Sequence, residues 1–148
     1  MRRCRKAAFL PELDPTEVAA VLTRKAEGDA KVMRKLADDE EIADDAVGFH
    51  AQQAIEKWLK AVIASRSEDF EYTHDIRHLI IRAKLEPREV NQPFDIRQAI
   101  NLTEYAVPLR YEDLLDAEPL DRASTVSLVE EVGQWAQNEI AASTPHRA

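Results

Sequence analysis

The feature that most constrains the fold is the stretch of residues 47–63, where polar and apolar side chains separate cleanly on a helical wheel. At about 100° per residue, the apolar residues of this stretch cover nearly half of the helix surface. They are Val47, Ala51, Ile55, Trp58, Leu59, Val62 and Ile63. A helix with so broad an apolar face must pack against more than one neighbouring helix. The stretch therefore predicts a helical bundle with this segment inside it.

A narrow polar stripe completes the same helix. His50, Gln53, Lys57 and Lys60 fall within an arc of roughly 80°, where an imidazole, an amide and two ammonium groups could bind an anionic or nucleotide-like ligand. The alternative is a solvated helix face. Gln52 lies inside the apolar arc, and because an unpaired buried amide is costly, it should form a hydrogen bond across the bundle or across a subunit interface.

Five helical segments account for most of the chain, and nothing alternates over the length of a strand. We predict an all-α, up-and-down antiparallel bundle of about five helices, with one short helix among longer ones. The helical domain spans residues 15–142, between a basic, flexible arm at 1–14 and a tail at 143–148. The second helix should cover residues 42–65, the fourth 95–107 and the fifth 121–142. Residues 108–120 should be irregular.

Capping residues mark where two of these helices begin. Asp14 should cap the first helix, with Pro15 at its first position. Thr73 should cap the third helix, with Asp75 in its first turn.

The bulk properties restrict the partners. The net charge of −8 means that any RNA contact is local, and DNA is not expected as a partner. No run approaches the ~20 apolar residues of a membrane span, so no membrane association is expected. The basic start of the chain is too short for a secretory signal, and the lone Cys4 excludes an intramolecular disulfide. We expect a cytoplasmic protein.

Two further polar clusters lie outside the central helix. The first is at residues 72–75, where His74 and His78 have the spacing of two imidazoles on one helical face. No third ligand accompanies them, so no metal is expected; His74 could pair with a carboxylate, and Asp75 could satisfy backbone donors. The second cluster places Arg110 beside Tyr111. It offers a bidentate phosphate binder next to a stacking ring, unless the arginine forms an ion pair within the chain.

The three clusters, in this order, resemble the HEPN family, named for higher eukaryotes and prokaryotes nucleotide-binding domains. The segment from Phe49 to Lys60 is similar to that family's Phe-His-Ala-Gln-Gln-Ala helix signature with its Glu-Lys and Leu-Lys pairs. Residues 73–76 with Leu79 resemble a second block. Tyr105 with residues 110–111 resembles a third.

The resemblance implies a bundle of about five helices, usually a homodimer, and a genomic or physical link to a minimal nucleotidyltransferase. Several branches of the family are metal-independent ribonucleases, some of them toxins, which carry an Arg followed four to six residues later by a His. None of the four histidines here has an Arg at that spacing. Cleavage needs both a titratable group and a cation, so the resemblance weakens at this point.

The sequence therefore favours a homodimeric module that binds a nucleotide, RNA or a nucleotidyltransferase partner without catalysis and without a cofactor. The predicted ligand-binding residues are His50, Gln53, Lys57, Lys60, His74, Asp75, Arg110 and Tyr111. One alternative is a ribonuclease toxin of a toxin–antitoxin pair. The other is an interaction scaffold in which these residues only hold the fold together.

Overall fold

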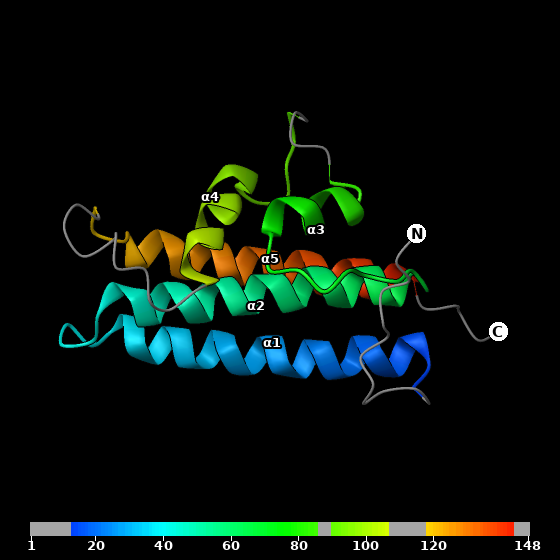
Figure 1. Cartoon of the computed structure of the whole chain (residues 1–148), viewed down its shortest axis with the longest axis horizontal. Helices are drawn as coiled ribbons and strands as arrows, with labels where there is room; N and C mark the ends of the chain where they lie inside the picture. The colour runs from blue at the N-terminus through cyan, green and yellow to red at the C-terminus, as the bar shows by residue number, and fades with distance from the viewer. Residues whose placement is uncertain (1–12, 86–89, 107–117, 144–148) are drawn as a thin grey trace.

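Helix α2 is the central element of the fold (Figure 1). The computed structural model describes residues 13–85, 90–106 and 118–143, and none of these residues belongs to a strand. The described residues form five α-helices and one 3-10 helix, which confirms the predicted all-α bundle. Their bounds are α1 Pro15–Ala37, α2 Asp44–Ser65, α3 Ile76–Arg82, α4 Ile96–Asn101, η1 Leu102–Ala106 and α5 Arg122–Ser143.

Helix α2 is covered from two sides. Helices α1 and α5 pack against it and against each other, while α3 and η1 contact it from the other side (Figure 1). Fourteen of its residues are buried, and they include the whole apolar arc seen in the sequence. Removing such side chains from water contributes about 1.5–3 kcal/mol each. The predicted contact with more than one helix is thus confirmed.

The direction of α5 adds a detail to the bundle. Arg122 at the start of α5 bonds to Asp44 at the start of α2, and Arg66 just beyond the end of α2 bonds to Glu139 near the end of α5. Helices α2 and α5 therefore run in the same direction, with α1 antiparallel to both (Figure 1). Helices α3 and α4 lie in the segment between α2 and α5, which returns the chain from the end of α2 to the start of α5.

Helix α1 begins as the sequence predicts. Asp14 is its N-cap and forms a capping box with Glu17, in which each side chain accepts a hydrogen bond from the other residue's backbone amide, at 2.9 and 3.0 Å. Its buried residues are Ala19, Ala26, Ala30 and Met33, and the three alanines are small. Small side chains let the backbones of α1 and α2 approach each other closely.

The short helices differ from the prediction in two respects. Two of the five helices are short instead of one, because the predicted fourth helix ends at Asn101 and continues as the 3-10 turn η1. The cap of α3 is Asp75, not Thr73: Asp75 accepts from the amide of Arg77 at 3.0 Å, and Thr73 accepts from the amide of Asp75 itself. Helix α5 faces inward with Val129, Val132 and Trp135.

Several predictions fall outside the described residues. They are the basic arm over residues 1–12, the tail over 144–148, most of the irregular segment 108–120, and the pair Arg110 and Tyr111. No described helix is long and apolar enough to cross a lipid bilayer.

Two helical glycines should respond to alanine in opposite directions. A Cβ on Gly48 in α2 would lie 2.4 Å from the ring of Tyr105 in η1, so Gly48→Ala must displace that ring and should cost about 1–3 kcal/mol. Gly28 in α1 has no atom within 4 Å of its Cβ position. Gly28→Ala should therefore gain up to about 1 kcal/mol of helix propensity. Urea unfolding of both variants is the measurement, and equal shifts of one sign would contradict the packing argument.

Candidate functional site

The predicted polar stripe lies on α2, but the structure divides it between two carboxylates. His50 and Lys57 turn toward α1, whereas Lys60 turns toward the segment that precedes α3. We define the α2 polar face as His50, Gln53, Lys57 and Lys60 together with His74.

Asp29 of α1 is the partner of the first group. One of its carboxylate oxygens lies 3.0 Å from His50 Nδ1, and the other accepts from the Lys57 ammonium. The three side chains are half-buried. The sequence did not lead us to predict Asp29 as a site residue. Its position among the buried residues Ala26, Ala30 and Met33 could have indicated that it faces α2.

Glu56 organises the second group. Its carboxylate accepts from Gln52 at 2.8 Å and from the Lys60 ammonium at 2.6 Å, and lies 3.0 Å from His74 Nδ1. Lys60 is only 9% exposed, so its predicted place on an open stripe is wrong. The angular rule takes a polar residue outside the apolar arc as solvent-facing. It does not anticipate that a lysine four residues after a glutamate can be buried together with it.

The charge of Glu56 is set by opposing effects. Burial alone raises the pKa of its carboxyl group. The hydrogen bonds from Lys60, His74 and Gln52, together with the Lys60 charge, outweigh burial, and the pKa lies below its ordinary value. Glu56 is therefore ionised at neutral pH and neutralises the buried ammonium.

Gln52 is fully buried and hydrogen-bonded, as its position in the apolar arc predicted. Besides Glu56, its amide nitrogen donates to the carbonyl of His74 at 3.2 Å, which ties α2 to the segment before α3. Its carbonyl oxygen accepts from Gln53 at 2.7 Å. Gln53 thus extends the Glu56 network toward the surface of α2.

The second predicted cluster acts locally. His74 precedes α3 and pairs with Glu56, whereas His78 lies within α3, 3.0 Å from Glu71. The two imidazoles therefore do not share one helical face, because α3 begins only at Ile76. Within the described part of the chain, no group of three or more His, Cys, Asp or Glu side chains is placed to hold a metal ion.

The geometry leaves two imidazole nitrogens available. His50 and His74 are each held through Nδ1 by a carboxylate, and within residues 13–85, 90–106 and 118–143 no hydrogen bond engages either Nε2. A carboxylate on one ring nitrogen fixes the orientation of the ring and the direction of the other nitrogen. Each of these imidazoles can therefore donate to, or accept from, a polar ligand through its Nε2.

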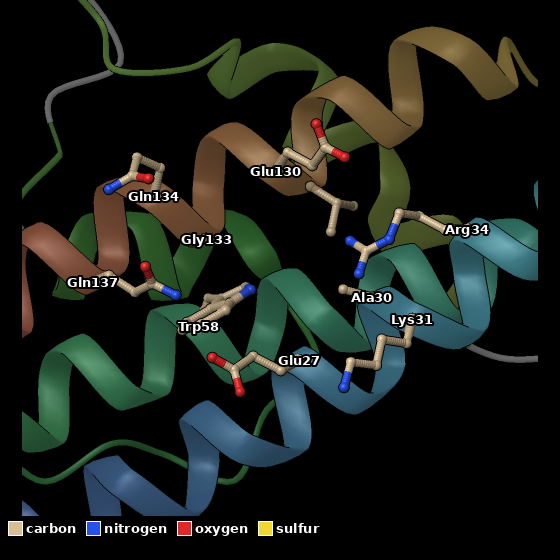
Figure 2. A pocket seen from close by; sticks show the side chains of 10 residues that line it. Glu27, Ala30, Lys31, Arg34, Trp58, Glu130, Gly133, Gln134 and Gln137 are labelled. Atoms are coloured by element: carbon tan, nitrogen blue, oxygen red, sulfur yellow. The ribbon is translucent and has the colours of Figure 1, made fainter.

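A cavity lies elsewhere, between α1 and α5 (Figure 2). Its volume is about 260 Å³, and the indole of Trp58, from α2, lies in its lining between the two helices. Lys31 and Arg34 come from α1, and Gln134 and Gln137 from α5. None of the predicted ligand-binding residues lines it.

Taken together, the helices define an all-α bundle module with a polar face on its central helix. The family model of the HEPN domain matches residues 19–140, and the chain therefore belongs to the HEPN domain family. The match runs from α1 almost to the end of α5 and confirms the resemblance found in the sequence. Comparisons with curated proteins and with solved structures gave no match.

Proposed function

We propose that this HEPN module binds a nucleotide, free or within an RNA strand, at the α2 polar face, and that it does so without catalysis. The observation that carries the proposal is the pair of oriented imidazoles. His50 and His74 each present an unengaged Nε2 from a ring that a carboxylate holds in place. Ribose hydroxyls and phosphate oxygens are suitable partners for such nitrogens.

The half-buried Lys57 supports the same assignment. Its ammonium is held by Asp29 beside His50, in a position to meet phosphate oxygens at the edge of α2. In the sequence, Gln53 lies between Asp29 and Glu56, the two carboxylates of the site. Its amide can form hydrogen bonds with a base or a ribose. Asp75, which caps α3, contributes by fixing the backbone next to His74.

The charge balance argues against cleavage. A ribonuclease needs a cation that neutralises the developing phosphorane charge. Of the two ammonium groups of this face, Lys60 is buried with Glu56, and the charge of Lys57 is offset by Asp29, so Lys57 can contact a phosphate without supplying the full positive charge that cleavage needs. The Arg-to-His spacing of the ribonuclease branches is also absent from the sequence. These points support a binding role over the alternative of a ribonuclease toxin.

The partner part of the proposal rests on the family. A homodimer and an association with a minimal nucleotidyltransferase are what the HEPN resemblance implies, and Arg110 and Tyr111 belong to the proposed ligand-binding residues on the ground of the sequence alone. The scaffold alternative assigns all of these residues to folding alone.

Isothermal titration of the protein with ATP, GTP and a 12-nucleotide RNA tests the proposal. We expect binding that Lys57→Ala weakens about tenfold, through loss of one charged contact. Lys31→Ala, in the cavity between α1 and α5, is the matched control and should bind normally. Absence of heat with every ligand would favour the scaffold.

Two measurements on the same sample test the remaining parts. RNA incubated with the protein and no metal should stay intact, and cleavage would overturn the non-catalytic assignment. Light scattering should give twice the chain mass of 16.8 kDa. A monomer would contradict the dimer.

A further inference from the structure

The aromatic ring of Tyr72 stands nearly free of the protein. Tyr72 is 87% exposed, and it is the one aromatic among the exposed large apolar side chains of the described residues. It lies between α2 and α3, two residues before His74. A large ring in this position offers both apolar area and an aromatic face to a partner.

Hydrogen bonds fix the backbone that carries this ring. Arg82 donates to the carbonyl of Asp69. The amide of Thr73 donates to the carbonyl of Glu71 at 2.9 Å. The bond from Gln52 to the carbonyl of His74 holds the other end. A ligand that meets Tyr72 therefore does not have to order the segment first.

The neighbours of the ring are polar. The imidazole of His74 stands edge-on to it, with centroids 6.5 Å apart and planes at 67°. The ammonium of Lys60 lies 5.9 Å from its centroid and 5.7 Å from that of Phe70. His74 itself is 58% exposed in its side chain. An open ring and an available Nε2 thus lie side by side.

The local charge differs from that of the whole chain. Residues 66–84 carry four carboxylates and four Lys or Arg side chains, whereas the full chain has a net charge of −8. One of those carboxylates, Glu68, forms an ion pair with Lys84, and another, Glu71, lies 3.0 Å from a ring nitrogen of His78. Phosphate groups are therefore repelled less here than over most of the surface.

We propose that Tyr72 and His74 form a stacking site for one unpaired nucleobase. The base stacks on the Tyr72 ring, and His74 Nε2 forms a hydrogen bond to the ribose or phosphate of the same nucleotide. This inference rests on the proposed nucleotide binding and names its base contact. Stacking needs a base whose face is free, so the ligand is a free nucleotide or a single strand and not a duplex.

Fluorescence anisotropy with a labelled 12-nucleotide oligo(A) RNA tests the site, with ATP and a 12-base-pair RNA duplex as competitors. Loss of one base–aromatic stack corresponds to about a 5- to 150-fold loss of affinity, so Tyr72→Ala should fall in that range. Tyr72→Phe keeps the ring and should bind like the wild type. The duplex should compete poorly; competition by ATP at micromolar concentration would identify a free nucleotide as the better ligand.

Ile81→Ala provides the matched control, because Ile81 is also an exposed apolar side chain and lies on α3. It should leave binding unchanged, and thermal melting should show that all three variants remain folded. If Tyr72→Ala binds as tightly as the wild type while Lys57→Ala is weakened, the stacking site is wrong and the proposed function stands. If the wild type binds neither RNA nor ATP, both fall.

Discussion

Replacing Arg122 with methionine should lower the free energy of unfolding by about 3 kcal/mol. This guanidinium joins the starts of α2 and α5 to the end of α1. Its Nε donates to the Asp44 carboxylate at 2.9 Å. Its two terminal nitrogens donate to four backbone carbonyls, those of Leu36, Ala37, Asp39 and Ile42.

The expected size follows from what remains after the substitution. The last carbonyls of a helix have no partner within the helix, and here the arginine supplies one for the end of α1. Methionine fills similar space but donates nothing, so the carbonyls and the Asp44 charge lose their partner together. Hydrogen bonds to charged groups contribute about 1.5–3 kcal/mol each when buried, and the partial exposure of Arg122 reduces their sum.

Thermal and urea unfolding measure the effect. A loss of about 3 kcal/mol corresponds to a melting temperature lower by roughly 10 °C in a domain of this size. Arg97→Met is the control, since Arg97 is exposed on α4 and its side chain forms no hydrogen bond within the described residues. Equal destabilisation by the two variants would show that Arg122 does not hold the helix ends together.

The sequence was sufficient for the features that depend on neighbours along the chain. The N-cap at Asp14, the broad apolar arc of α2 and the buried amide of Gln52 all follow from capping preferences, helix periodicity and the cost of unpaired polar groups. The bundle follows from the arc, because so broad a face needs several partners.

The ion pairs could not be predicted in the same way. Asp29 is 21 residues from His50 in the chain, and Arg122 is 78 residues from Asp44. Such contacts depend on how the helices are placed, which periodicity leaves open. Lys60 shows the same limit, since its burial depends on Glu56 and on the rings of Phe70 and Tyr72.

Glu56→Gln should have the largest effect of any single substitution in the site, about 3–5 kcal/mol of lost stability. The carboxylate is almost fully buried and is the ion-pair partner of the buried Lys60 ammonium. A neutral amide leaves that charge uncompensated. The double substitution of Glu56 and Lys60 by methionine removes both charges, and it should recover most of the loss because two apolar side chains can replace a buried ion pair.

The pH dependence gives the same prediction an independent measurement. The pKa of Glu56 is lower in the folded chain than its ordinary value of 4.5. Its ionised form therefore stabilises the fold fully above that value, and this contribution is lost as the pH falls through the lower, folded pKa. Urea unfolding between pH 7 and pH 3 should show this loss in the wild type and in Glu131→Gln, a control at an exposed position of α5. In Glu56→Gln that part of the acid dependence should disappear; if it persists, the Glu56 carboxylate is not the group that carries it.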